Sequence, residues 1–296
     1  MKPVIALWVL VTCLPLCALA EDTALPQASP PAGIPVKLTP AQIVEKNLAA
    51  RGGVEAWQKV QTMVWMGHVE GSNTPASKLP FVLGMKRPNK TRFEITAVYQ
   101  KSLRIYDGKD GWKVRPASSG VPETHPFSPE ELQYAHDTQV IDGPLMDAAA
   151  KGLPIQLEGE QELEGRKAYR LVVRSGPGAS QRIWVDAETF LELKYERPGR
   201  NASGAPSLVP IYLREYQSFE GLQLPTLIET GSGRTDNPAA DKMVIEKIAL
   251  NAKLGDEMFT KPQSAGQKRK RVVVDTRNSA PASPGVSSAP KASAQP

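Results

Sequence analysis

Residues 79–99 read LPFVLGMKRPNKTRFEITAVY, and this stretch decides the fold because apolar and polar side chains alternate along it. The apolar positions of its first half are Leu79, Phe81, Leu83 and Met85. The second half repeats the pattern with Phe93, Ile95, Ala97 and Tyr99 opposite Arg92, Glu94 and Thr96. A period of two is typical of a β-strand with one buried face. The stretch therefore predicts antiparallel strands with one apolar face.

The same alternation recurs on both sides of this stretch and predicts about ten strands in all. Two helical segments interrupt the strands. Thr39-Pro40-Ala41-Gln42 and Ser128-Pro129-Glu130-Glu131 each combine a capping residue, a proline at the first helical position and a capping-box side chain. A long sheet with one apolar face must curl or be covered. The sequence thus predicts an α+β protein whose curved antiparallel sheet carries helices on its concave face.

The two ends of the chain differ from the middle in composition. Residues 1–20 contain an early lysine, an apolar run and the pair Ala18 and Ala20, which is typical of a cleaved secretory signal peptide. An uncleaved N-terminal anchor is the alternative. Residues 21–38 form a predicted Pro/Ala-rich linker, and residues 261–296 a predicted disordered tail rich in Pro, Ser, Ala and Lys. One domain is expected between them, over residues 39–260.

The positions of the cysteines and the net charge indicate where the protein acts and what it can bind. Both cysteines, Cys13 and Cys17, lie in the predicted signal peptide, so the processed chain would have no thiol and no disulfide. The net charge of +5 lies partly in the basic run 268–271. Such a run is a solvated cluster or a contact to an anionic envelope surface. Because export to the periplasm is predicted, nucleic acid is not expected as a partner.

The sequence contains no recognisable catalytic motif. Its three histidines, His68, His125 and His136, do not have metal-ligand spacing, and no nucleophile elbow, P-loop or dinucleotide fingerprint occurs. The glutamates that alternate over residues 158–164 fit the solvated side of a strand better than an acid/base pair. The sequence therefore predicts a protein that is not an enzyme, without metal or cofactor, and leaves a carboxylate hydrolase as an alternative.

Large apolar side chains concentrate in the predicted strands. Methionine and aromatic residues adapt to irregular apolar ligands, although such residues also fill ordinary cores. The predicted ligand-binding residues are Trp65, Phe81, Leu83, Met85, Phe93, Ile95, Tyr99, Leu103 and Trp112.

Several short motifs resemble those of one family. MKRPN at 85–89 precedes an alternating strand and then YDGKDGW at 106–112, and RIWVD at 182–186 and Met258-Phe259 follow later. Together they are similar to LolA/LolB-like outer-membrane lipoprotein-sorting proteins over roughly residues 40–260. The resemblance implies an unclosed antiparallel β-barrel with helices as a lid over an apolar cavity. It also implies that Arg87, the arginine before a proline, fastens the lid.

The resemblance implies a function as well. The chain is expected to be a monomeric periplasmic carrier or chaperone that transports lipid or lipoprotein acyl chains and has no catalytic chemistry. The alternative is a structural or interaction protein of the envelope, with a packed half-barrel and a basic tail that contacts the membrane surface or envelope proteins. Two features depart from a minimal carrier: the tail, and an expected Pro/Gly-rich loop over Pro198–Pro206.

Overall fold

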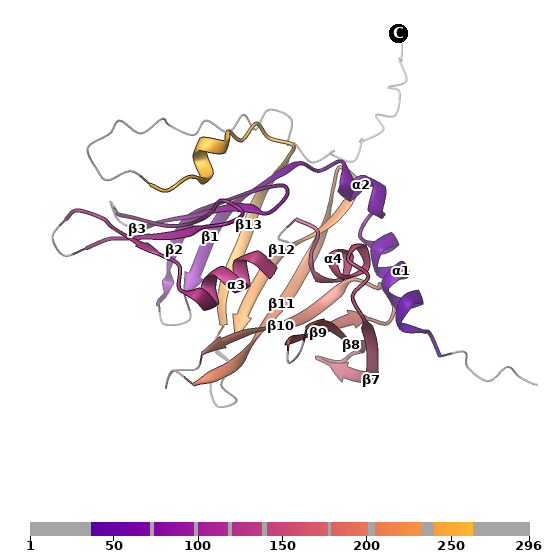
Figure 1. Cartoon of the computed structure of the whole chain (residues 1–296). Helices are drawn as coiled ribbons and strands as arrows, with labels where there is room; N and C mark the ends of the chain where they lie inside the picture. The colour runs from indigo at the N-terminus through magenta and orange to yellow at the C-terminus, as the bar shows by residue number, and fades with distance from the viewer. Residues whose placement is uncertain are drawn as a thin grey trace, which may run out of the picture. The chain divides into compact units, whose positions relative to one another are not determined.

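The structure is a computed structural model that describes residues 37–71, 74–97, 100–117, 120–137, 141–176, 179–200, 205–231 and 240–262. All described helices and strands belong to one compact unit that begins at Leu38. The helices are α1 (Pro40–Ala50), α2 (Val54–Gln58), α3 (Pro129–Asp137), α4 (Pro144–Ala150) and the 3₁₀ helix η1 (Asp256–Phe259) (Figure 1).

The strands are β1 (Thr62–Gly71), β2 (Thr74–Lys86), β3 (Lys90–Ala97), β4 (Gln100–Tyr106), β5 (Gly111–Arg115), β6 (Glu123–Pro126), β7 (Ile155–Leu163), β8 (Arg166–Gly176), β9 (Ala179–Asp186), β10 (Glu192–Arg200), β11 (Pro206–Phe219), β12 (Leu222–Gly231) and β13 (Ala240–Leu250). They form one antiparallel sheet in the order β6-β5-β4-β3-β2-β1-β13-β12-β11-β10-β9-β8-β7. The end strands β6 and β7 do not pair with each other, so the described sheet is unclosed.

Helix α1 begins as its sequence predicts. The Thr39 hydroxyl accepts from the Gln42 amide at 3.3 Å, and the Gln42 side chain accepts from the Thr39 amide at 2.9 Å. Pro40 occupies the first turn, where it costs no hydrogen bond. The helix ends before Gly52, whose φ of +111° and whose contact with the Gly221 carbonyl leave no room for a side chain. This contact fixes the end of α1 against the β11–β12 turn.

The two faces of the sheet carry different layers. We call the face that carries the α-helices the inner face; there Trp57, Ile141 and Met146 pack against strand residues. The outer face carries the η1 segment, whose Leu254 and Phe259 pack on β1, β4 and β13. Figure 1 shows α3 and α4 on one side of the sheet and η1 on the other. The predicted helix-covered sheet is confirmed.

Some expectations differ from the structure or fall outside it. The sheet has thirteen strands instead of about ten, and the short edge strand β6 is one that we did not expect. Pro198 and Gly199 lie within β10, paired with Leu208 and Ser207, so the start of the expected loop is strand, while residues 201–204 lie outside the described residues. The predicted signal peptide, most of the linker, Tyr99 and nearly all of the tail lie outside the described residues. Within those residues, no helix is long and apolar enough to cross a membrane.

Candidate functional site

Six of the nine predicted ligand-binding residues come together on the inner face. They lie on three neighbouring strands: Trp65 on β1, Phe81, Leu83 and Met85 on β2, and Phe93 and Ile95 on β3. The register pairs Leu83 with both Trp65 and Phe93, and Phe81 with Ile95. The rings of Phe81 and Phe93 are tilted against each other, with centroids 5.8 Å apart. The sequence thus located a continuous apolar surface, and its role in binding stays a prediction.

Some positions of this apolar surface are fully buried, and others are only half-buried. Met85 and Phe81 are 0% and 2% exposed and belong to the cluster that Ile141 and Met146 complete. Further apolar side chains against the same cluster are only half-buried. They form what we call the half-buried strip: Val69, Leu83, Phe93, Ile95, Ile228 and Met243. The strip is apolar surface that the protein's own side chains cover incompletely.

Two predicted residues, Leu103 and Trp112, lie on the outer face instead. Trp112 pairs with Ile105 and packs in the cluster of Leu254 and Phe259, and Leu103 pairs with Glu94 and Val114. On this face Leu254 and Phe259 pack with Ile105 of β4 and Trp112 of β5. The inner-face positions of these strands hold Arg104 and Lys113 instead. The structure therefore does not bring Leu103 and Trp112 together with the other six.

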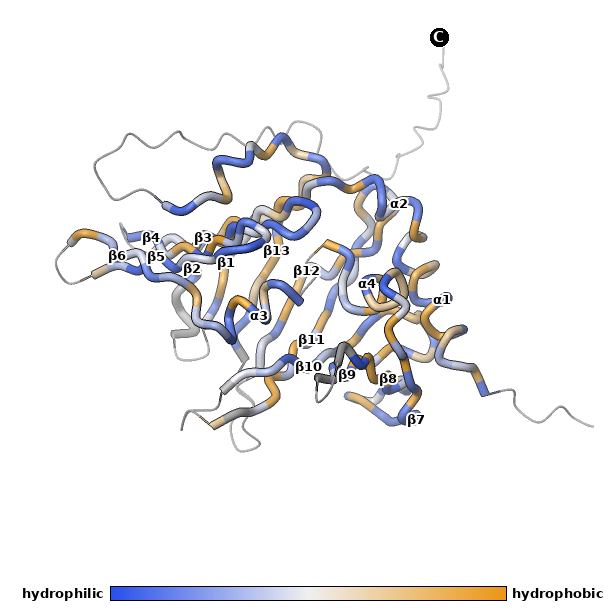
Figure 2. Tube along the Cα trace, in the orientation of Figure 1, coloured by the Kyte–Doolittle hydropathy of each residue, from blue (hydrophilic) through white to orange (hydrophobic). Residues whose placement is uncertain are grey.

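Helix α3 is attached to the sheet mainly by charged groups. None of its residues is buried, and its trace is mostly hydrophilic (Figure 2). Glu131 accepts hydrogen bonds from Lys113 at 2.7 Å and from Arg104 at 3.0 Å, and its carboxylate also accepts from the Ser128 amide at 2.9 Å. Burial alone would raise the pKa of Glu131, but these bonds outweigh it and lower the pKa to about 2. The inner-face cations Arg104 and Lys113 thus serve to hold α3.

We expect the attachment of α3 to weaken in acid. The folded-state pKa of Glu131 lies below its ordinary value of 4.5, so its contribution is full above pH 4.5 and is lost as the pH falls toward 2. Glu131→Gln is expected to lower the free energy of unfolding by about 2 kcal/mol at neutral pH, less than the full pKa shift because the site is partly solvated. Urea unfolding of both proteins across this pH range measures the difference, which should shrink toward zero. A difference that stays constant with pH would contradict the assignment.

Arg87 connects the sheet to the segment between α3 and α4. Its Nη1 donates to Asp142 Oδ2 at 2.6 Å, and its Nη2 forms a second bond to Asp142 Oδ1. The guanidinium also donates to two main-chain carbonyls, from Nε to Val60 at 2.7 Å and from Nη2 to Trp57 at 3.1 Å. The bond to Asp142 raises the pKa of Arg87 against the effect of burial. A planar guanidinium can satisfy all of these acceptors at once.

Asp142 is a residue whose role sequence reasoning missed. Asp142-Gly143-Pro144 has the composition of a helix break and gives no sign of an ion pair. In the structure its carboxylate binds Arg87, while its main-chain carbonyl accepts from Arg51 Nη1 at 2.7 Å. Arg51 is 6% exposed and lies 4.0 Å from Glu192. The contacting pairs are 55 to 141 positions apart in the chain, which no local pattern can reveal.

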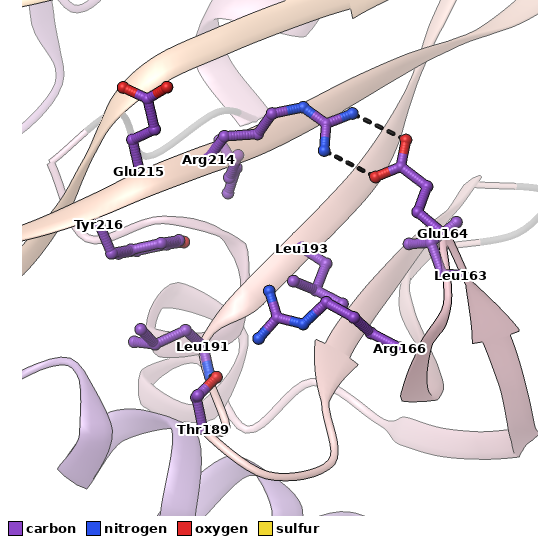
Figure 3. A pocket seen from close by; sticks show the side chains of 10 residues that line it. Leu163, Glu164, Arg166, Thr189, Leu191, Leu193, Arg214, Glu215 and Tyr216 are labelled. Atoms are coloured by element: carbon purple, nitrogen blue, oxygen red, sulfur yellow. Dashed lines mark hydrogen bonds and ion pairs between the residues drawn. The ribbon is translucent and has the colours of Figure 1, made fainter.

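A separate pocket lies away from the inner-face surface. It has a volume of about 310 Å³ and is lined by residues of the β7–β8 turn, the β9–β10 connection and β11. Arg214 donates to Glu164 at 2.6 and 2.8 Å across its rim, and Glu215 points away from the other side chains (Figure 3). None of the predicted ligand-binding residues lines it. Arg214 and Glu164 are thus paired with each other, and Arg166 is paired with Asp186 at 2.8 Å.

Comparison with known proteins supports the fold. No family model and no curated protein matches the sequence. A solved structure of a LolA superfamily protein from Nitrosomonas europaea is similar, with a TM-score of 0.50, 16% sequence identity and coverage of 76% of this chain and 99% of that one. The chain therefore has an unclosed LolA-like fold, as its motifs implied.

Two further solved structures are similar at TM-scores below 0.5. One is a DUF1329 family protein from Desulfovibrio piger, at 0.49, 13% identity and coverage of 75% of this chain and 97% of that one. The other is a putative outer membrane lipoprotein-sorting protein domain from Vibrio parahaemolyticus, at 0.48, 11% identity and coverage of 74% and 95%. The fold assignment rests on the Nitrosomonas protein.

Proposed function

We propose that this protein is a non-catalytic periplasmic carrier that binds acyl chains of a lipid or lipoprotein on the inner face of its sheet. The half-buried strip would contact the chains. Helix α3 and residues 141–150, which together we call the lid, would open for loading and close again through Arg87. The predicted signal peptide and the absence of cysteine outside it support export.

The observation that carries this proposal is the contrast between the strip and the helix over the sheet. The strip is apolar but incompletely covered, whereas α3 buries none of its residues and is attached by Glu131. Each methylene group that leaves water contributes about 0.8 kcal/mol, so an acyl chain gains from contact with such a strip. Helix α3, which polar contacts hold, can leave the sheet without exposing a core of its own, whereas movement of α4 would also expose Leu145, Met146 and Ala148.

The first test is native mass spectrometry of the secreted protein isolated from its own periplasm. Organic extraction of any adduct would then identify the bound compound. A stoichiometric lipid or acylated peptide is the expected result. A bare protein mass, together with no uptake of added fatty acid or lipopeptide, would contradict the proposal.

A matched pair of substitutions on β2 tests the site itself. Leu83 belongs to the half-buried strip, whereas Val82 points to the other face and is 37% exposed. Leu83→Asp is expected to weaken fatty-acid binding at least about tenfold, because a carboxylate would be desolvated by the acyl chain. Val82→Asp should leave binding unchanged. Titration with a fluorescent fatty acid measures both, and equal effects of the two variants would contradict the site.

The alternative function is an interaction protein of the envelope with a filled interior. The specific observation in its favour is the packed part of the inner face, where Trp57, Met85 and Met146 are at most 5% exposed. On that reading the tail beyond residue 260 recruits the partner. Deleting residues 261–296 distinguishes the two, because a carrier should still bind lipid and a tail-dependent protein should lose its partner.

A further inference from the structure

The lid is held at Asp142 from two sides, and the second side belongs to Arg51. Arg87 binds the carboxylate of Asp142, whereas Arg51 binds its main-chain carbonyl. Gly143 lets the main chain come this close: a Cβ there would lie only 3.2 Å from Arg51 Nη1. The bond from Arg51 therefore depends on the position of the lid backbone and not on the side chain of Asp142.

Arg51 has a second acceptor within reach that it does not bond directly. Glu192 Oε1 lies 4.0 Å from Arg51 Nη1, beyond hydrogen-bond distance. Glu192 is 4% exposed, and its Oε1 has no hydrogen-bond partner among the described residues. A buried carboxylate oxygen without a hydrogen bond destabilises the fold. The Arg51 guanidinium beside Glu192 Oε1 is a donor that could supply that bond. The backbone of Glu192 is itself fixed, because its carbonyl accepts from the Tyr216 hydroxyl at 2.9 Å.

The main chain of Arg51 is also fixed, so only its guanidinium group can move. The guanidinium lies over the Trp57 ring at 4.2 Å, and Trp57 Nε1 donates to the Arg51 carbonyl at 3.0 Å. The Arg51 carbonyl also accepts from the Gln223 amide at 3.0 Å. A small rotation across the indole face is enough to bring Nη1 from the lid carbonyl to Glu192.

We propose that Arg51 is a positioning residue that exchanges partners when the lid moves. It bonds to the Asp142 carbonyl while the lid is closed and to Glu192 Oε1 once the lid has left. The exchange keeps the buried guanidinium bonded in both states, and so it lowers the free-energy cost of opening. This inference rests on the lid movement of the proposed function, and it assigns to Glu192 the role of stabilising the open state.

Thiol labelling in the absence of lipid tests this exchange. Ile141 is 7% exposed beside Asp142, so a cysteine placed there by Ile141→Cys reacts only when the lid opens. The two native cysteines lie at positions 13 and 17, in the predicted signal peptide, so the processed chain carries no other thiol. In this background Glu192→Gln is expected to slow labelling about tenfold, because the open state loses one hydrogen bond between charged groups. Glu188→Gln, an exposed change on the β9–β10 turn, should leave the rate unchanged.

A double-mutant cycle separates the exchange from a general effect on packing. In an Arg51→Met background, Glu192→Gln should no longer slow labelling. Unchanged or faster labelling in Glu192→Gln would overturn the inference, as would equal slowing in both backgrounds. Labelling that requires global unfolding, shown by the same urea dependence as unfolding itself, would overturn it too. Because lipid is absent from this experiment, its outcome is independent of the mass-spectrometric test of cargo.

Discussion

Arg87→Ala is expected to lower the free energy of unfolding by about 3 kcal/mol, since it leaves the Asp142 carboxylate without its bidentate partner. The Arg87 and Asp142 side chains are only 22% and 18% exposed, so water compensates little. The carbonyls of Val60 and Trp57 lose donors at the same time. We also expect residues 141–150 to exchange their amide hydrogens faster, because Asp142 has lost one of the two arginines that bind it. Urea unfolding and hydrogen exchange measure the two effects.

Two further variants make this result specific to the ion pair. Arg87→Lys keeps the charge but cannot bind both carboxylate oxygens in a plane, so an intermediate loss is expected. Adding Asp142→Asn to Arg87→Ala should recover part of the stability, because no unpaired buried charge then remains. If Arg87→Ala unfolds at the wild-type urea midpoint, Arg87 does not hold the lid.

Trp57→Ala is expected to have the largest effect on stability, a loss of about 4 kcal/mol. The side chain is 1% exposed within the inner-face cluster, so its removal leaves a cavity. The same residue supports both arginines: its ring lies under Arg51 and its carbonyl accepts from Arg87. The loss in stability should therefore be accompanied by faster opening of the lid. Urea unfolding measures the first effect and thiol labelling at position 141 the second.

Trp57→Phe is the companion variant if the alanine variant does not fold. It keeps an aromatic ring under Arg51 and removes the indole N–H, whose acceptor, the Arg51 carbonyl, still receives a bond from the Gln223 amide. A loss of about 1–2 kcal/mol is expected, with lid opening close to that of the wild type. Equal losses in both variants would show that the ring does not support Arg51.

Local sequence patterns predicted the helices and strands, but they did not predict on which face of the sheet every apolar residue lies. The Thr39–Gln42 capping box and the alternation in β2 and β3 specify structure within a few residues, and both are confirmed. Leu103 and Trp112 alternate equally well, yet they lie on the outer face, where Trp112 packs with Leu254 and Phe259 from the far end of the domain. An alternating strand shows that one face is buried and cannot show which layer buries it.

For the candidate site, too, local patterns predicted some residues and could not predict others. Arg87 could be singled out because it stands in a short motif, MKRPN, that resembles a family with a lid. Asp142, Arg51 and Glu192 stand in no such motif, and their contacts exist only after the helices have packed on the sheet. The arginine of the ion pair was thus accessible to sequence reasoning, and its partners were not.

The unclosed sheet has a consequence for association between copies of the chain. The edge strands β6 and β7 present backbone groups that a strand from another molecule could pair with. Along β7 the exposed positions include Glu158, Glu160 and Glu162, and charged side chains on an edge strand disfavour its pairing with another strand. On the other side β6 has four residues and ends at Pro126, which offers no N–H. The molecule can thus keep its sheet open without polymerising edge to edge.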